Sequence, residues 1–177
     1  PLTPAVLRER LLARLEDFFE LGYNEPSQIR EYVAAVPDYK LSGFGGNTSC
    51  FELLTENTNI IIDCGTGLHE LSSQIARANQ RRGPSTFHIF LTHFHWDHIQ
   101  GLPFFEPLFN PNSHVHFYAV QPELEEVITT LFKKPFFPIS LHKLQSKLEF
   151  HQLEPRRPFE LQDLIVTPYL LDHPDPC

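Results

Sequence analysis

The strongest constraint on the fold of this chain is a run of metal-binding side chains directly after an apolar, β-prone segment. His93, His95, Asp97 and His98 fall within six positions and follow residues 87–91. His93 and His95 are two residues apart, so they share one side in extended backbone and diverge on a helix. The run is therefore predicted at a strand end or in the loop that follows it.

Imidazole and carboxylate groups are the ligands that zinc and similar divalent metals prefer. Four ligands in six residues predict two metal ions rather than one, with Asp97 and His98 facing the second. The alternative is a histidine-rich loop without a ligand role, which so dense a cluster disfavours. The chain holds ten histidines, and isolated ones are expected at the surface or in the core. They include His69, His88, His142 and His151.

Short β-prone runs alternate with amphipathic segments along the rest of the 177 residues. This alternation predicts a layered α/β arrangement. The expected strands are residues 49–54, 59–62, 86–91, 115–120, 148–152 and 164–167. The expected helices are residues 3–21, a shorter one from about 27 to before Pro37, and residues 68–80 and 123–132.

Composition excludes several classes of function. The 14 Lys and Arg against 22 Asp and Glu give a net charge of −8, which argues against long nucleic acid as a partner. No segment approaches the roughly 18 apolar residues of a membrane helix, and the charged first twenty residues do not form a secretory signal. Cys50, Cys64 and Cys177 are too scattered for a disulfide framework, so a reducing, cytoplasmic setting is expected.

The wider run at residues 91–105 resembles a known signature. His93-x-His95-x-Asp97-His98 resembles the motif of the metallo-β-lactamase fold hydrolases. The full run is similar to the branch that contains ribonuclease Z-like and cyclic-nucleotide phosphodiesterase-like proteins. Residues 45–50 resemble the glycine loop of that branch, and residues 61–67 resemble its strand-to-loop Asp-x-Gly motif.

The resemblance covers residues 41–177 and implies an αββα sandwich domain, with residues 1–40 as a helical N-terminal segment or insertion. The sandwich would be incomplete at its C-terminus, because the family pattern continues with a bridging Asp and a last His that have no counterpart here. The sequence also contains no methionine. We therefore expect the chain to be an N-terminal portion of a longer protein.

The resemblance implies a role for each candidate ligand. His93 and His95 would bind the first metal together with His173, which follows His98 at the family's usual separation. Asp97 and His98 would bind the second metal. The implied ions are two Zn²⁺, with Mn²⁺ or Fe²⁺ as alternatives.

The resemblance also implies a mechanism. A water held between two such ions has its pKa lowered toward 7, so hydroxide is available to attack a phosphodiester. Asp97 would act as the catalytic residue that orients this hydroxide nucleophile. Asp63 would hold a ligand histidine in one tautomer, and an ordinary turn residue is the equal alternative.

Several functions stay open at this point. The expected substrate is a small-molecule or nucleotide phosphodiester, and a homo-oligomer is compatible with the sequence. The alternatives are hydrolysis of a carboxylic ester, lactone or thioester at the same metals, and a non-catalytic metal-binding domain.

Overall fold

The structure is a computed structural model that describes residues 4–36, 46–55, 58–79 and 85–170. The chain divides into two units, residues 1–47 and residues 48–177. The predicted domain boundary after residue 40 lies among residues 37–45, outside the described ranges, so it stays a prediction. The candidate ligand His173 also lies outside them.

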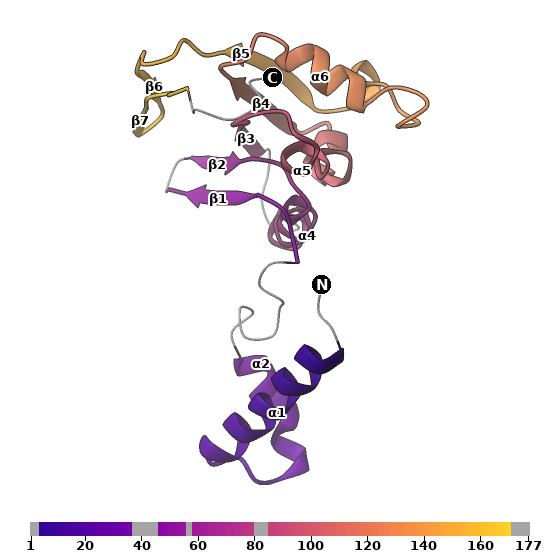
Figure 1. The fold of residues 1–177 in the computed structure, drawn as a ribbon, viewed down its shortest axis with the longest axis vertical. Helices are drawn as coiled ribbons and strands as arrows, with labels where there is room; N and C mark the ends of the chain where they lie inside the picture. The colour runs from indigo at the N-terminus through magenta and orange to yellow at the C-terminus, as the bar shows by residue number, and fades with distance from the viewer. Residues whose placement is uncertain (1–3, 37–45, 56–57, 80–84, 171–177) are drawn as a thin grey trace. The chain divides into compact units, whose positions relative to one another are not determined.

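The first unit contains a pair of helices (Figure 1), and aromatic side chains pack between them. Gly22 follows the first helix with φ +86°, a left-handed conformation that favours glycine. The ring of Phe18 meets that of Tyr32 edge-on, 5.3 Å between centroids, and Tyr32 donates a hydrogen bond to the Arg14 carbonyl at 2.8 Å. Both predicted helices are confirmed. The elements are α1 (Pro4–Glu20), η1 (Pro26–Gln28) and α2 (Ile29–Ala35).

The second unit is built on a five-stranded sheet of order β1-β2-β3-β4-β5. β1 runs antiparallel to β2, and the other neighbours are parallel. The strands are β1 (Phe51–Leu54), β2 (Asn59–Ile62), β3 (Ser85–Phe90), β4 (Ser113–Ala119) and β5 (Lys147–Gln152). The helices are α4 (Gly67–Asn79), α5 (Trp96–Ile99), α6 (Leu124–Leu131) and the short η2 (Leu102–Phe104), η3 (Glu106–Phe109) and η4 (Leu141–Lys143).

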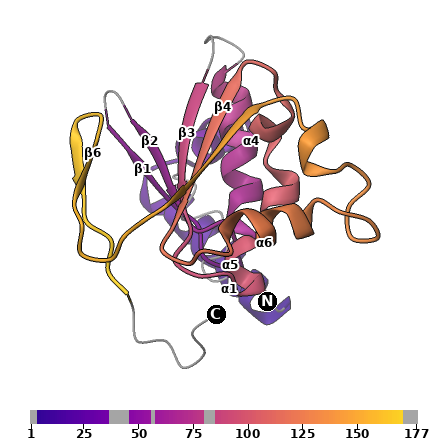
Figure 2. The same ribbon diagram turned by 90° about the horizontal axis from the view of Figure 1, so that it is seen from above.

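One face of the sheet is covered by α4 and α6 (Figure 2). Ile61, Ile89 and Phe117 point to this side from successive strands and are fully buried. Leu68 of α4 and Ile128 of α6 pack in the same core. Alternate strand residues therefore form the main core, and the intervening residues face the other way.

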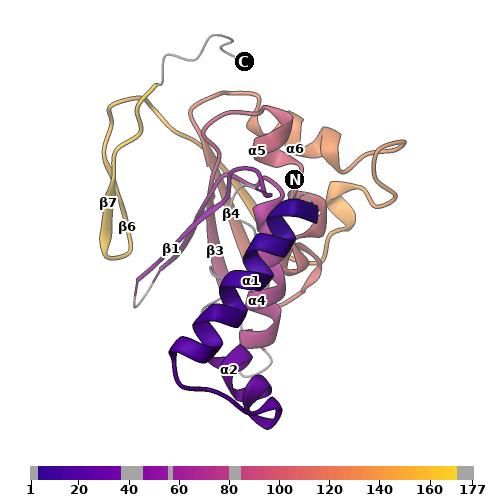
Figure 3. The ribbon, with the colours of Figure 1, turned by 60° about the horizontal axis from the view of Figure 1, so that its bottom comes forward.

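The opposite face carries a two-stranded hairpin of β6 (Phe159–Leu161) and β7 (Leu164–Val166), on the side away from α4 and α6 (Figures 2 and 3). Ile60 and Tyr118 of the sheet pack against Leu161. An apolar groove of about 430 Å³ lies between the sheet and this hairpin. The layered α/β arrangement predicted from the sequence is thus confirmed. None of the described helices has the length and apolar character needed to cross a membrane.

The four parallel strands β2 to β5 end at a common edge of the sheet. Asp63 follows β2 there, His93 lies just beyond β3, and Gln121 follows β4. The Gln121 side-chain amide donates a hydrogen bond to the Thr92 carbonyl at 3.1 Å. In parallel sheets, ligands bind at the carboxyl ends of the strands. The predicted metal-binding residues therefore lie where such a fold places a site.

Candidate metal centre

The His93–His98 segment changes conformation halfway along. His93 and His95 precede the helical turn α5, and His95 at its N-cap has φ −60° and ψ 148°, which is extended. Asp97 and His98 lie within α5, whose first turn is closed by the His98 amide bonding the His95 carbonyl at 2.9 Å. The predicted extended conformation holds for the first two candidates, and the other two occupy a helical turn.

The turn brings the candidate side chains together. The His93 ring lies 4.0 Å from the His98 ring and 4.6 Å from the His95 ring, measured between centroids. A carboxylate oxygen of Asp97 lies 3.6 Å from Nε2 of His98. Within the described residues, these four side chains do not form a group of three ligand atoms all within 4.8 Å of one another. The side chains would therefore have to turn for any three of them to bind one ion.

Asp63 lies beneath this cluster as a buried hydrogen-bond acceptor. Its Oδ2 is 2.8 Å from Nδ1 of His98. The other carboxylate oxygen accepts the Thr92 amide at 2.9 Å, and the Ser49 hydroxyl donates to Oδ2 at 3.2 Å. Asp63 adopts φ 60°, a left-handed conformation that costs a non-glycine residue about 1 kcal/mol or more and is held by these contacts. A carboxylate at Nδ1 leaves Nε2 of His98 as the nitrogen that could bind a metal ion.

Close backbone contact positions α5 on the loop after β2. The Cys64 amide donates to the His98 carbonyl at 2.6 Å, and the Gly101 amide donates to the Cys64 carbonyl at 2.7 Å. A Cβ atom on Gly101 would meet the carbonyl oxygen of Gly65, and one on Gly65 would meet the carbonyl oxygen of Asp97. These two glycines let the two loops approach, which a side chain would prevent.

The cysteines near the site are not activated. Cys64 is fully buried, and burial raises the pKa of its thiol well above the usual range, with Cys50 and Asp63 adding to the effect. Burial also raises the pKa of Cys50 to about 11. Neither thiol therefore serves as a nucleophile at neutral pH.

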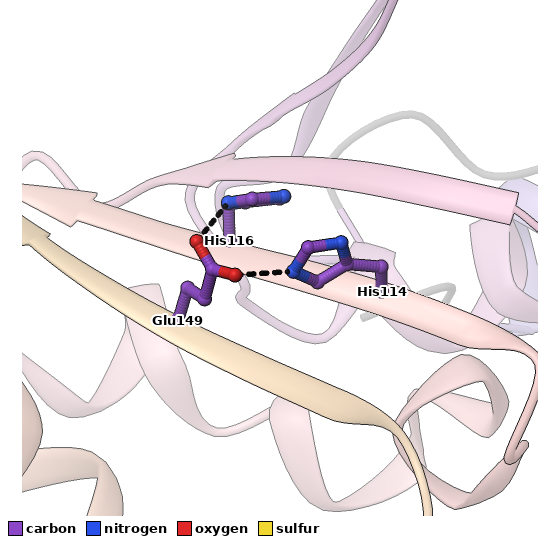
Figure 4. Close-up of side chains that lie close together, drawn as sticks. All are labelled: His114, His116 and Glu149. Atoms are coloured by element: carbon purple, nitrogen blue, oxygen red, sulfur yellow. Dashed lines mark hydrogen bonds and ion pairs between the residues drawn. The ribbon is translucent and has the colours of Figure 1, made fainter.

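A second cluster lies on the sheet face away from α4 and α6. His114 and His116 of β4 converge on the carboxylate of Glu149 in β5 (Figure 4). Nε2 of His114 is 3.0 Å from Oε1 of Glu149, and Nδ1 of His116 is 3.4 Å from Oε2. These three residues were not predicted as metal ligands from the sequence. The His-x-His spacing in a strand was the available signal, since it places both rings on one face.

Burial and the neighbouring imidazoles oppose protonation of His116. Burial, followed by the neighbouring imidazoles of His114 and His88, lowers the pKa of His116 to about 4. A hydrogen bond from Lys147, at 2.6 Å, is the largest cause that lowers the pKa of Glu149 to about 2. At neutral pH the carboxylate is therefore ionised and His116 is neutral.

Two of the histidines expected to lack a ligand role border this cluster. His88 is buried and its Nδ1 lies 3.0 Å from the Tyr118 hydroxyl. Nε2 of His151 lies 3.0 Å from Nδ1 of His116. His69 and His142 are exposed.

Comparison with known proteins identifies partial relatives. A lactamase-like protein, nscB of Aspergillus fumigatus, is 36% identical over 88 residues, 45% of this chain and 26% of that protein. A ribonuclease Z of Synechococcus sp. is 30% identical over 124 residues, 66% of this chain and 36% of that protein. Lactamase-like protein notP of Aspergillus sp. is 38% identical over 56 residues, 32% of this chain and 17% of that protein. The chain thus spans about a third or less of these relatives.

Solved structures with similar folds include the metallo-β-lactamase fold protein YhfI from Bacillus subtilis. It is 18% identical with a TM-score of 0.46, and the match covers 71% of this chain and 46% of that one. Unliganded yeast PDE1 is 17% identical with a TM-score of 0.45, and the match covers 65% of this chain and 48% of that one.

The family itself is identified by a match that extends over most of the second unit. Residues 58–176 match the family described as "Beta-lactamase superfamily domain". This range is more than half of the 177 residues and includes the His93–His98 segment and Asp63. The chain therefore belongs to the beta-lactamase superfamily domain family, as the resemblance at residues 91–105 implied.

Proposed function

We propose that this chain supplies metal ligands to a divalent-metal-dependent hydrolase, and that the bond it cleaves is a phosphodiester. One observation carries the proposal: His93, His95, Asp97 and His98 gather at the carboxyl edge of the parallel strands, above the buried Asp63. Membership of the beta-lactamase superfamily supports the hydrolase class.

The donor set fits a pair of zinc-like ions. Imidazole nitrogen and carboxylate oxygen are zinc ligands, and the carboxylate–histidine contact between Asp63 and His98 is the usual support of a metal-bound histidine. Bound divalent ions would supply a water with lowered pKa and would polarise the scissile group. His93 and His95, with His173, are assigned to the first ion, and Asp97 and His98 to the second.

The residues of the chain have separate tasks in this proposal. Asp63 fixes the ring of His98 through Nδ1, so that Nε2, which lies 3.6 Å from the Asp97 carboxylate, would bind an ion. The Asp97 side chain is 57% exposed, so its carboxylate can reach both an ion and the attacking water. Asp97 therefore orients the nucleophile.

The phosphodiester class is supported by the relative named ribonuclease Z. The net charge of −8 favours a small-molecule or nucleotide diester over long RNA, because bound cations reverse the field only locally. Cys50 and Cys64 are free thiols in the structure, which supports a reducing, cytoplasmic setting.

The proposal is tested by metal content and turnover measured on the same preparation. Bis(p-nitrophenyl) phosphate is the diester substrate, p-nitrophenyl acetate the ester comparison, and a chelator removes the metal. We expect diester turnover that the chelator abolishes and zinc restores. His95→Ala should lose metal, and Asp97→Asn should lose turnover while the first metal stays. His142→Ala, which removes an exposed imidazole, serves as the control and should behave as the unmodified protein.

Other outcomes overturn the proposal in distinct ways. Turnover of the acetate without turnover of the diester would assign the site to esters, lactones or thioesters. Metal binding without turnover of either substrate would make these 177 residues an incomplete enzyme or a metal-binding module, and the diesterase assignment would be withdrawn for this chain. Full diester turnover in Asp97→Asn would remove Asp97 from the reaction.

A further inference from the structure

We propose that His114, His116 and Glu149 form a further, separate binding site for a zinc-like divalent cation on the sheet face away from α4 and α6 (Figure 4). This inference is independent of the proposed hydrolase function, because none of its three ligands belongs to the His93–His98 segment.

The register of the sheet brings these ligands together. β4 and β5 are parallel, with His114 opposite Lys147 and His116 opposite Glu149. Residues two apart in a strand share a face, so both imidazoles and the carboxylate point to the same side. Val115 and Phe117, between and after them, are fully buried in the core on the other side. The arrangement is therefore held by the strands themselves and by the core beneath.

The distances between ligand atoms already approach those of a zinc site. Zn–N and Zn–O bonds of about 2.0–2.1 Å at tetrahedral angles place ligand atoms roughly 3.3–3.4 Å apart. Nε2 of His114 is 3.0 Å from Oε1 of Glu149, and Nδ1 of His116 is 3.4 Å from Oε2. One ligand atom from each residue lies within 4.8 Å of the other two. Small side-chain rotations therefore suffice to bind an ion.

A fourth ligand is available from the same strand as Glu149. Nε2 of His151 lies 3.0 Å from Nδ1 of His116 and 3.7 Å from Oε2 of Glu149. The ring of His88 stacks on that of His116, with centroids 4.9 Å apart, and its Nδ1 forms a hydrogen bond with the Tyr118 hydroxyl. The His116 ring is thus fixed from one side, while the ligands stay accessible: the side chain of His114 is 28% exposed and that of Glu149 is 35% exposed.

The competing interpretation is a hydrogen-bonded cluster without an ion. The Lys147 ammonium bonds Oε1 of Glu149 at 2.6 Å and supplies a positive charge where the ion would be. The Lys147 side chain is 67% exposed, so it can turn into solvent when a cation replaces it. Imidazoles this close to one another repel when protonated, and the neutral form is the one that binds metal. The exposed Lys147 side chain and the neutral imidazoles both favour the cation site over the hydrogen-bonded cluster.

The two sites are separate in space. His116 pairs with His88 in the sheet, and His88 precedes His93 by five residues. His114 pairs with Thr86, and the strand from Thr86 to its end at Phe90 advances about 13 Å, whereas ligands of one ion lie within a few ångströms of it. An ion at Glu149 therefore does not replace an ion at His93 and His95.

The test removes His93 and His95 and counts the zinc that remains, because Asp97 and His98 alone are too few ligands to hold zinc through dialysis. In the full chain, the double variant His93→Ala/His95→Ala is dialysed against Zn²⁺ and its zinc content is measured, and Co²⁺ absorption reports the ligand geometry. We expect about one zinc ion per chain to remain, with a tetrahedral Co²⁺ spectrum. Adding His114→Ala/His116→Ala should remove both signals. The matched control adds His69→Ala/His142→Ala instead, which removes two exposed imidazoles and should change neither signal.

Two results would overturn the site. One is a His93→Ala/His95→Ala variant that binds no zinc. The other is equal zinc content with and without His114 and His116. Glu149→Gln keeps the size of the side chain and one acceptor oxygen but removes the negative charge, so it tests the site should the alanine variants fail to fold. It should weaken Zn²⁺ binding at least about tenfold while the circular dichroism spectrum is unchanged.

Discussion

Gly101 offers the sharpest test of how the metal loop is positioned. The Gly101 backbone is right-handed, with φ −79° and ψ −18°, a conformation that alanine also adopts. Because alanine reduces the conformational entropy of the unfolded chain, this change alone would stabilise the fold by about 0.4–1 kcal/mol. The packing predicts the opposite sign. A Cβ there would meet the carbonyl oxygen of Gly65 and would lie 2.9 Å from that of Cys64, and both are backbone atoms that cannot rotate away.

The expected size follows from two costs. Overpacking costs about 1–3 kcal/mol, and displacement weakens the Gly101 amide hydrogen bond to Cys64, worth about 1 kcal/mol. After the entropic gain is subtracted, Gly101→Ala should lower the free energy of unfolding by about 1–3 kcal/mol. With a urea dependence near 2 kcal/mol/M, the midpoint falls by about 0.5–1.5 M.

Urea unfolding followed by tryptophan fluorescence measures this directly, because Trp96 is the sole tryptophan of the chain and lies in α5. Gln74→Ala is the control: Gln74 is exposed on α4 of the same unit, where alanine favours the helix. It should leave the Trp96 transition unchanged. An unchanged or higher midpoint for Gly101→Ala would refute the close approach of the two loops.

Three further predictions address the core, the support of the site and pH. Phe117→Ala should cost about 3–5 kcal/mol in thermal unfolding, because Phe117 is fully buried between sheet and helices; a loss below 1 kcal/mol would contradict its place in the core. Asp63→Asn should weaken Zn²⁺ affinity about 10–100-fold in competition with a chromophoric chelator, since His98 loses its carboxylate partner; equal affinity would exclude that support. In metal-free protein, the free energy of unfolding should fall as the pH drops from 6.5 toward about 4. In that window His116 binds a proton in the unfolded chain, whereas its lowered pKa keeps it neutral in the folded protein. His116→Gln should flatten this dependence in urea titrations, and an unchanged slope would assign it to other groups.

Most elements were predictable because apolar periodicity is a local signal. β2 matches its predicted residues 59–62, and α6 differs from the prediction by one residue at each end. β6 was missed because three residues around the charged Glu160 carry no alternating pattern. The helical turn α5 was missed because four residues show no helical periodicity.

Candidate ligands that are close in sequence were predictable, and ligands that only the sheet brings together were not. His93, His95, Asp97 and His98 were found because they are close in sequence, and their role as ligands stays a prediction. The Glu149 cluster was missed because Glu149 and His116 are brought together by the β4–β5 register, which the sequence does not reveal.

The contacts of Asp63 have a consequence for folding. Its carboxylate joins Ser49, Thr92 and His98, which are 14, 29 and 35 residues away along the chain. Contacts of such separation form only after the strands between them have assembled. High-affinity metal binding at this edge would therefore be a property of the native state alone, and an ion bound there would shift the folding equilibrium by mass action. Metal affinity and thermodynamic stability should accordingly rise and fall together across variants of the Asp63 network.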